Sequence, residues 1–397
     1  MTQSFHRPVW DRGDAIDAQM LAFTVGDDPL WDRRLVEHDI TGSLAHVRGL
    51  ARVGLVTGED CRAICDGLER LLASFRRGEW TVEAGDEDVH SAVERRLTEL
   101  VGEPGKRLHT GRSRNEQVTV DVRLWLRAAN AQARELVVAL SESLARAAER
   151  HRDLPLPGYT HLRRAMPSTG GDWFGAHARA FQLDVDEFDH ALRLARECPL
   201  GSGAGYGVPL PLDREFVARE LGFDRPVEPV THVQHSRGRA ELAHVTALEA
   251  VALDIGKLTS DLWLYSTSEF GFVKLPTAFT TGSSLMPHKR NPDAIELARA
   301  HARTISSERA ALLELVRDLP SGYHRDFQLL KPPLFRAHDS AVAMLALLPR
   351  LVDALEFDVE ALQAACADPK LAATQRALEK VKAGVPFRDA YREEAQR

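Results

Sequence analysis

Several residue types and patterns are scarce in this 397-residue chain, and each scarcity excludes a class of protein. Only four cysteines are present, none in a CxxC pair, which argues against a disulfide-stabilised secreted domain. HExxH is also missing, so no metal site is predicted. No apolar run reaches the roughly 20 residues of a membrane helix. The N-terminal segment carries charges and a proline where a signal peptide needs an apolar core, so we expect a cytoplasmic protein without a membrane partner.

Positive charge is outweighed overall but concentrated locally. The formal net charge of −7 gives no global electrostatic reason to expect a nucleic-acid partner. Four cations nevertheless fall within residues 106–114, and Lys289 and Arg290 follow a glycine and two serines. Cations beside Gly and Ser are typical of a pocket for a small anionic ligand, although charge alone favours a solvated basic face.

Long helices are the dominant feature of the sequence. No Gly or Pro interrupts residues 117–152, and apolar residues recur there near the helical period, which predicts a rod of roughly 50 Å. These apolar residues spread over several faces, so the rod must be buried on most sides, and we expect an oligomeric bundle. Similar stretches occur at residues 173–197, 237–268, 293–317 and 337–355.

The fold class predicted from these stretches is all-α, with a central bundle of long helices. A compositional shift near Asp358 and shorter amphipathic segments before residue 108 divide the subunit into three parts. We expect an N-terminal helical domain (1–108), a central long-helix bundle domain (109–357) and a small C-terminal helical domain (358–397).

The segment HTGRSRN, residues 109–115, lies at the predicted start of the longest helix. Free N–H groups and the helix dipole attract carboxylates at such a start, and neighbouring guanidinium groups strengthen the attraction. The alternative is a helix cap whose arginines pair with acids elsewhere. We favour an anion site, and its candidate residues are Arg112, Ser113, Arg114 and Asn115.

Three further polar segments hold candidate residues. GYTHL, residues 158–162, places His161 in a loop, where it is a general acid or base candidate, although a lone loop histidine is more often structural. TGSSLMPHKRNPD, residues 281–293, offers Ser283 and Ser284, but it is also readable as a polar loop in which Asn291 caps the next helix and Pro292 enters its first turn. LPSGYHRDFQLLK offers donors to a ligand, or a plain helix connection.

Together these segments resemble the argininosuccinate lyase family, in the fumarase/aspartase superfamily. GSSLMPHKRNP at 282–292 matches the superfamily loop, and HTGRSRN and GYTHL match segments typical of the argininosuccinate branch. The resemblance runs from near residue 20 to near residue 392. It implies a homotetramer whose active sites are each built from three subunits, a small anionic substrate, no cofactor, and β-elimination of argininosuccinate to fumarate and arginine.

The resemblance also implies roles for individual residues. Ser283 and His161 would share the proton transfers, with the acid and the base left unassigned within the pair, and Glu296 would polarise His161. Lys289 and Asn291 would stabilise the doubly charged aci-carboxylate. The remaining implied contacts are Ser113, Asn115 and Thr160 to the substrate carboxylates, Tyr323, Gln328 and Lys331 to the arginine side, and His90 near the site.

Departures from the family pattern leave an alternative open. The early segment FTVGDD places Asp27 or Asp28 where the family commonly carries a serine. A related lyase that eliminates fumarate from another N-substituted aspartate is therefore the second hypothesis. A non-catalytic structural protein on the same scaffold is the third, and the presence of Ser283, His161, Lys289 and Asn291 argues against it.

Overall fold

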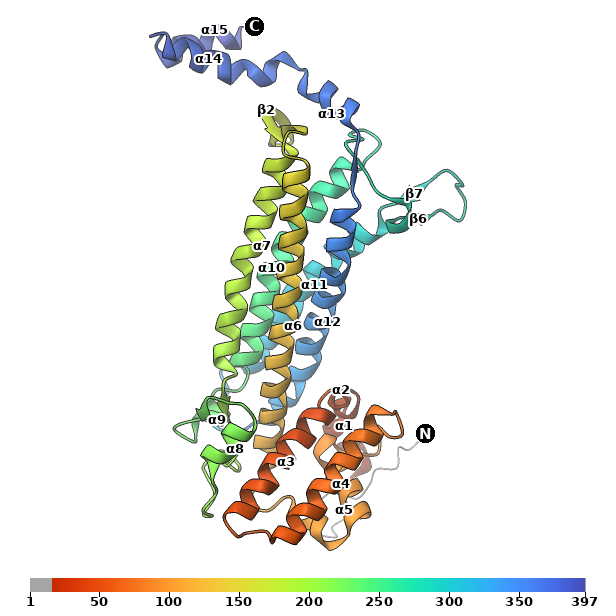
Figure 1. Ribbon diagram of the computed structural model, residues 1–397, viewed down its shortest axis with the longest axis vertical. Coiled ribbons are helices and arrows are strands. Elements are labelled where there is room, and N and C mark those ends of the chain that lie inside the picture. The colour runs from red at the N-terminus through yellow and green to blue at the C-terminus, as the bar shows by residue number, and fades with distance from the viewer. Residues whose placement is uncertain (1–15, 397) are drawn as a thin grey trace. The chain divides into compact units, whose positions relative to one another are not determined.

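The computed structural model describes residues 16–396, so the segment 1–15, where no signal peptide is expected, and Arg397 lie outside the described residues. Long helices dominate the described chain, which confirms the all-α prediction (Figure 1). Each predicted long helix is present, with its ends shifted by a few residues. Their bounds are α6 (Arg114–Arg150), α7 (Gly170–Leu194), α10 (Arg239–Tyr265), α11 (Asp293–Val316) and α12 (Lys331–Asp353).

Shorter elements precede, connect and follow the long helices. The shorter α-helices are α1 (Ala18–Val25), α2 (Asp28–Asp32), α3 (Val36–Arg52), α4 (Gly58–Arg76), α5 (Val89–Val101), α8 (Arg214–Glu220), α9 (His232–His235), α13 (Val359–Cys366), α14 (Ala373–Lys382) and α15 (Phe387–Ala395). The 3-10 turns are η1 (Glu103–Arg107), η2 (Thr277–Phe279), η3 (Arg325–Leu330) and η4 (Pro369–Ala372). The strands are β1 (Pro155–Thr160), β2 (Arg163–Thr169), β3 (Glu197–Cys198), β4 (Arg225–Pro226), β5 (Val273–Lys274), β6 (Thr281–Gly282), β7 (Arg290–Asn291) and β8 (Glu356–Phe357).

The chain divides into two compact units. Unit 1 holds the described residues up to Ala131 together with Phe188–Thr246 and Glu308–Arg336, and unit 2 holds the remainder. Because all five long helices run from one unit into the other, the units share continuous backbone. No described helix is long and apolar enough to cross a membrane.

Unit 1 combines the N-terminal helices and the first part of α6 with residues 188–246 and 308–336. A buried apolar cluster joins α3, α6 and α8 through Ala45, Val120 and Val217, and it extends to Phe223. Asp88 caps α5 by accepting a hydrogen bond from Ser91 N, as expected for an acid before a helix. The apolar cluster packs the first part of α6 against α3 and α8.

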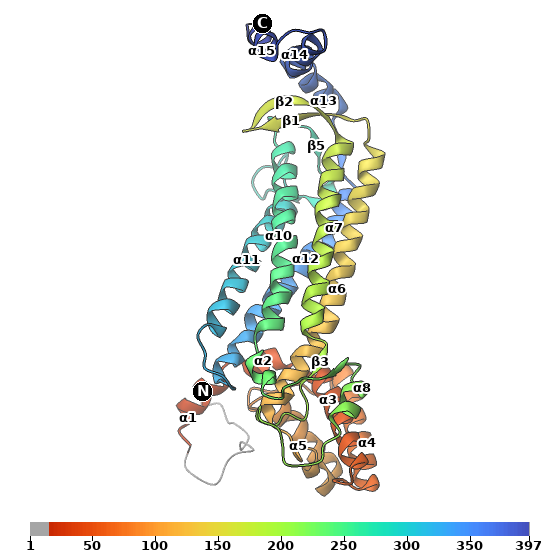
Figure 2. The same cartoon turned by 90° about the vertical axis from the view of Figure 1, so that its left-hand side faces the viewer.

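Unit 2 contains the parts of the five long helices that do not belong to unit 1, and these lie side by side (Figures 1 and 2). Polar contacts between helices accompany the apolar packing. Ser143 on α6 donates to Asp353 on α12, and Trp173 on α7 donates to Asp261 on α10. The antiparallel hairpin β1–β2 connects α6 to α7 at one end of this bundle (Figure 2).

Candidate active site

The start of α6 has a capping arrangement that explains why the helix begins there. Ser113 Oγ accepts a hydrogen bond from Asn115 N, and Glu116 Oε1 accepts one from Ser113 N. This reciprocal pattern, a serine followed three residues later by a glutamate, is a capping box, and the sequence SRNE carried its signature. Gly111 precedes it with φ +66°, and a Cβ there would lie 2.9 Å from Leu210 Cδ1. The prediction that HTGRSRN opens the longest helix is confirmed.

A pocket of about 350 Å³ lies beside this helix start and belongs wholly to unit 1; we call it the first pocket. Five segments far apart in the chain supply its walls. Eight predicted site residues line it, namely His90, Arg112, Ser113, Arg114, Asn115, Tyr323, Gln328 and Lys331. It also includes residues that the sequence analysis did not assign to a site, namely Asp28, Asp32, Asp88, His109, Val118, Arg237, Arg325 and Phe327.

The two arginines of HTGRSRN are held differently. Arg114 is paired with Asp88 and with Glu87, its Nη1 lying 3.1 Å from Glu87 Oε2. Arg112 is buried, its Nη1 donates to Ser43 Oγ at 2.9 Å, and its Nε finds no hydrogen-bond partner in the structure described. Arg114 therefore fits the alternative of a helix cap whose arginines pair with acids elsewhere. Arg112 does not, because its Nε–H donor is unused beside the pocket.

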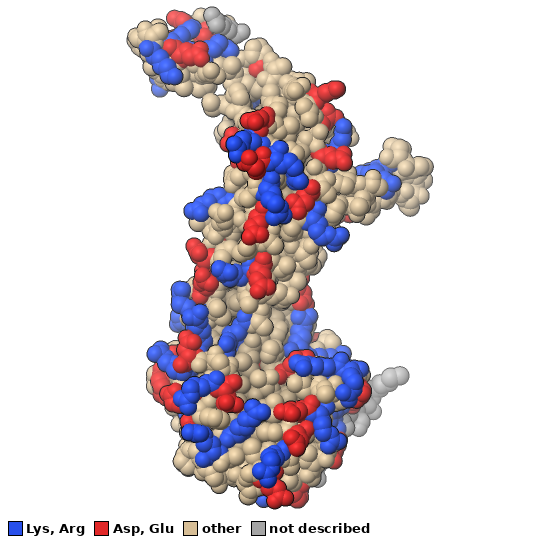
Figure 3. All heavy atoms as spheres, viewed as in Figure 1, with Lys and Arg blue, Asp and Glu red and all other residues tan. Residues whose placement is uncertain are grey.

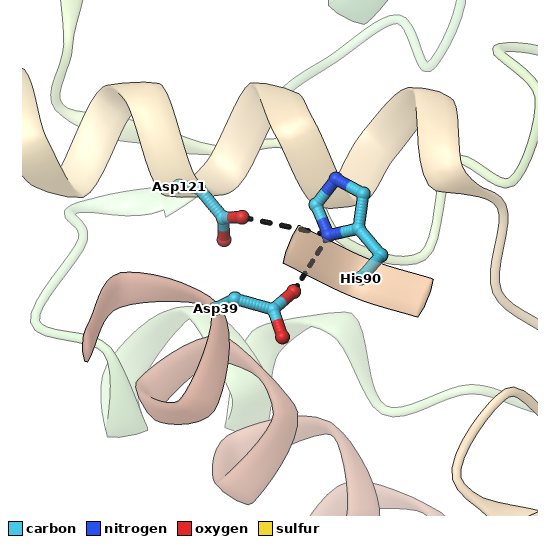
Figure 4. Close-up of side chains that lie close together, drawn as sticks. All are labelled: Asp39, His90 and Asp121. Atoms are coloured by element: carbon cyan, nitrogen blue, oxygen red, sulfur yellow. Dashed lines mark hydrogen bonds and ion pairs between the residues drawn. The ribbon is translucent and has the colours of Figure 1, made fainter. Parts of the chain in front are cut away.

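His90 is fixed by two buried carboxylates, as Figure 4 shows. Its Nδ1 lies 2.7 Å from Asp39 Oδ1 on α3 and 3.7 Å from Asp121 Oδ2 on α6. Burial lowers the pKa of His90, but the hydrogen bond and charge of Asp39, with the charges of Asp88 and Asp32, outweigh it and raise the pKa overall. Burial, with the neighbouring Asp39, raises the pKa of Asp121 well above its usual range.

The same three residues offer one ligand atom each within 4.8 Å of one another, a spacing that could hold a metal ion. The short contact to Asp39 places the proton of His90 on Nδ1, since the carboxylate can only accept. A nitrogen that carries a proton has no lone pair for a metal. We therefore interpret Asp39, His90 and Asp121 as a proton-holding group.

Lys331 forms another part of the pocket wall, together with two aspartates. Its Nζ is 2.5 Å from Asp32 Oδ1 and 2.8 Å from Asp28 Oδ1, and only 4% of the side chain is exposed. Burial opposes its charge, but the two aspartates raise the pKa of Lys331 overall. Burial raises the pKa of Asp28 to about 7 against the lowering effect of Lys331, so Asp28 gains or loses its charge near neutral pH.

Gln328 and Tyr323 complete that wall. The Gln328 amide donates to the carbonyl oxygens of Thr24 and Val25, both at 3.0 Å, and so ties η3 to the end of α1. Tyr323 packs edge-on against Phe327, with ring centroids 5.8 Å apart. The first pocket therefore has a basic side at α6 and a mixed acidic and basic side at α2 and η3.

The remaining predicted residues belong to unit 2 and do not line the first pocket. GYTHL was expected to be a loop. His161 and Leu162 do lie in a turn, but residues 158–160 form the end of β1. His161 and Leu162 are the two central residues of this hairpin, with φ of 54° and 55°. A two-residue turn of type I′ has positive φ at both positions, which costs non-glycine residues roughly 1–3 kcal/mol each. Thr160 and His161 are exposed.

The glycine–serine loop joins β6 to β7 and protrudes from the helices of unit 2 (Figure 1). Ser283 Oγ accepts hydrogen bonds from Leu285 N and Met286 N, at 3.3 and 3.0 Å, and Lys289 is exposed. Asn291 lies in β7, so its expected role as a helix cap is wrong; the carbonyl of Pro292 accepts from Ile295 N and Glu296 N instead. On the face drawn in Figure 3, basic and acidic side chains are interspersed along the helices.

Glu296 follows in the first turn of α11. Its Oε1 accepts a hydrogen bond from Trp263 Nε1 of α10 at 3.2 Å, and its side chain is exposed. The structure therefore brings together the predicted substrate-binding residues of unit 1, while Thr160, His161, Ser283, Lys289, Asn291 and Glu296 stand outside that pocket.

Solved structures with the same fold define the class of protein. EDDS lyase in complex with formate superposes with a TM-score of 0.83 at 23% identity, covering 96% of this chain and 76% of that one. A fumarate lyase:delta crystallin from Brucella melitensis gives 0.79 at 18% identity, covering 100% and 93%. A class II fumarase from Schistosoma mansoni gives 0.77 at 17% identity, covering 98% and 92%. The fold is that of fumarase/aspartase-type lyases.

Sequence relatives narrow the class to a family. The family model described as Lyase matches residues 12–306. An argininosuccinate lyase of Sorangium cellulosum is 45% identical over 98% of this chain and 90% of its own length. Those of Stenotrophomonas maltophilia and Xanthomonas euvesicatoria are each 43% identical, over 97% and 98% of this chain and 89% and 90% of their own. The chain belongs to the argininosuccinate lyase family and is a lyase.

Proposed function

We propose that this protein catalyses the reversible β-elimination of argininosuccinate to fumarate and L-arginine, the last step of arginine synthesis, without a cofactor. One observation carries the proposal. In a chain of this family, eight residues expected to contact the substrate come from three distant segments and line one pocket. A polar pocket of about 350 Å³ suits a small, highly charged molecule.

The charges of the pocket complement such a substrate. Argininosuccinate carries three carboxylates, an ammonium group and a guanidinium group. The carboxylates of the succinyl part would meet Arg112, Ser113 and Asn115 at the positive end of α6. The ammonium group would meet Asp28, which is a carboxylate above about pH 7 and also lines the pocket.

The reaction itself requires groups that the first pocket lacks. Removing a proton next to a carboxylate creates a dianion, and each donor placed on that charge is worth about 3–4 kcal/mol of barrier. We assign proton transfer to Ser283 and His161 as a pair, polarisation of His161 to Glu296, and stabilisation of the dianion to Lys289 and Asn291. Thr160 would hold a substrate carboxylate.

Exposure of those groups supports a homotetramer. Such chemistry needs a site closed to water, yet Thr160, His161 and Lys289 are exposed in the single chain. The long helices also expose large apolar residues, among them Leu253 (62% exposed) and Leu297 (60%). We therefore propose that three subunits contribute to each site. The three-part domain division and the cytoplasmic location also remain predictions.

Incubation of the purified protein with argininosuccinate, followed by the ultraviolet absorbance of fumarate, tests the proposal. We expect fumarate and arginine in equal amounts. Adenylosuccinate and other N-substituted aspartates serve as comparison substrates. Suppose that the protein turns over one of these substrates and not argininosuccinate, while light scattering shows it to be tetrameric. That result would establish the alternative, a related lyase that acts on another N-substituted aspartate.

A further inference from the structure

A second pocket of about 240 Å³ lies in unit 1, further along α6 than the first pocket. The first pocket meets α6 at Asn115 and Val118, whereas the second meets it at Thr119, Val122 and Arg123. None of the residues assigned above to substrate binding or proton transfer lines it. Its other walls come from the end of α7, from β3 and from the start of α10.

Arginines dominate the lining of the second pocket. It is lined by four arginines and two glutamates, namely Arg123, Arg193, Arg237, Arg239, Glu197 and Glu241. Burial and nearby arginines lower the pKa of His232, so this lining histidine is neutral at pH 7 and adds no charge. The formal charge around the pocket is therefore about +2, in a protein whose net charge is −7.

The glutamates do not neutralise the arginines evenly. Glu197 already pairs with Arg225 at 2.7 Å. Glu241 lies 3.5 Å from Arg237 Nε, too far for a good hydrogen bond. Among the described residues, Arg193 and Arg239 have no carboxylate within ion-pair distance, and Arg193 contacts only the ring of His190, at 3.1 Å.

Arg123 is fixed by neutral acceptors. Its guanidinium group donates to the carbonyl oxygen of Glu197 at 2.5 Å and to Ser236 Oγ at 3.1 Å, so its charge is positioned but not cancelled. Guanidinium groups bind carboxylate and phosphate oxygens through paired N–H donors. A rigid buried guanidinium with two exposed ones beside it is therefore suited to a ligand with two negative charges.

Arg237 connects the two pockets, because it lines both. It is 6% exposed, and its Nε makes no hydrogen bond with any described residue. Its Nη1 reaches Thr119 Oγ1 only at 3.4 Å, and its guanidinium lies 5.0 Å from the ring centroid of Phe327, which lines the first pocket. An anion in the second pocket would attract the guanidinium group of Arg237, which also lines the first pocket.

We propose that the second pocket binds a small dianion, a dicarboxylate or a phosphate-bearing metabolite, and that bound dianion weakens substrate binding in the first pocket through Arg237. Binding at the second pocket stands independently of the proposed function, whereas the effect on turnover rests on it. The coupling between two such sites is typically 5-fold or more in affinity.

Binding is tested by isothermal titration calorimetry of the full-length protein with succinate and, separately, with inorganic phosphate. The double variant Arg193→Gln/Arg239→Gln removes the two exposed charges of the second pocket. Arg196→Gln/Arg219→Gln is the matched control, because it removes two exposed arginines of unit 1 that do not line either pocket. Because the first pocket is itself proposed to hold carboxylates, we expect a site in addition to any binding there. The affinity of this added site should be about tenfold or more weaker in the pocket variant and unchanged in the control variant.

The probes also distinguish the ligand. Tighter binding of succinate identifies a dicarboxylate site, and tighter binding of phosphate a phosphate site. The proposal is overturned if the native protein binds neither succinate nor phosphate. It is also overturned if the native protein and the pocket variant bind them equally well. In assays with argininosuccinate, phosphate should raise KM about 5-fold or more in the native and control proteins and leave the pocket variant unaffected. If the native protein binds phosphate but its KM does not change, the coupling between the two pockets is overturned, while binding at the second pocket stands. If the protein does not turn over argininosuccinate, the calorimetric test of binding is still valid.

Discussion

The candidate residues of unit 1 and those of unit 2 are held in opposite ways. In unit 1, His90, Lys331 and Arg114 are largely buried and paired with carboxylates from α2, α3 and the α5 cap. In unit 2, His161 and Lys289 are exposed, on a hairpin turn and a protruding loop. The candidate binding residues of unit 1 thus contribute to the stability of the single chain, whereas we propose that the exposed candidates of unit 2 need further subunits to exclude water.

The largest effect that this comparison predicts is the loss of activity without loss of fold when Ser283 is replaced by alanine. The side chain contacts only the backbone of its own loop, so removing it should leave stability unchanged. Removing a general acid or base costs about 10²–10⁴-fold in kcat. Ser284→Ala in the same loop is the control, and we expect a loss below about tenfold. Equal losses in both variants would mean that the loop acts as a whole and that Ser283 has no special part.

Two lysines test the contrast between the units directly. Lys331→Met leaves Asp28 and Asp32 without their partner, and breaking a buried pair costs about 3–5 kcal/mol in the free energy of unfolding. Lys289→Met removes an exposed charge that pairs with no described carboxylate, so stability should change by less than about 0.5 kcal/mol while kcat falls. Denaturant unfolding and initial rates on both variants decide the matter. A stability loss in Lys289→Met as large as in Lys331→Met would remove the distinction.

The Asp39–His90 pair predicts a pH-dependent stability. Because the folded protein raises the pKa of His90 above its ordinary value near 6.5, the pair stabilises fully below about pH 6.5, and this contribution is lost as the pH rises through the raised value. Asp39→Asn should therefore cost more in the free energy of unfolding at about pH 6 than at about pH 9. Asp121→Asn changes a carboxyl that lies 3.7 Å from His90 Nδ1, beyond hydrogen-bond distance, so it is the control and should cost less at both pH values. A penalty for Asp39→Asn that does not vary with pH would contradict a charged His90.

The smallest expected effect concerns Asp28 and the substrate ammonium group. Its raised pKa of about 7 means that the carboxylate forms only as the pH rises through 7. KM should therefore fall about tenfold between pH 6 and pH 8 in the native protein and stay high and flat in Asp28→Asn. Asp27→Asn changes an exposed neighbour outside the pocket and serves as the control. A pH-dependent KM that persists in Asp28→Asn would assign the titration to another group.

Much of the fold followed from local sequence signals. Helical periodicity located α6, α7, α10, α11 and α12, and the serine–glutamate spacing at residues 113–116 marks the start of α6. The hairpin at GYTHL could not be predicted in this way, because His161 and Leu162 occupy positions where Gly or Asn is the usual turn signal.

The site was predictable only in part. Motif residues identified eight members of the first pocket, but their partners could not be found from sequence spacing. Asp32 and Lys331 are 299 residues apart, and Asp39 and His90 are 51 apart. Such pairs depend on which helix faces pack together, and this is decided by the tertiary fold. Arg237 lay in no motif that the sequence analysis used, and only the pockets reveal it.

Subunit mixing tests the central claim, that the residues of each active site come from different subunits, most directly. Ser283→Ala and His161→Asn homotetramers, each inactive, would be dissociated, mixed and reassembled, and the rate of fumarate formation would be compared with that of either parent. If sites are shared, some sites in the mixed tetramers contain neither substitution, and partial activity returns. Mixed tetramers that remain as inactive as both parents would contradict shared sites.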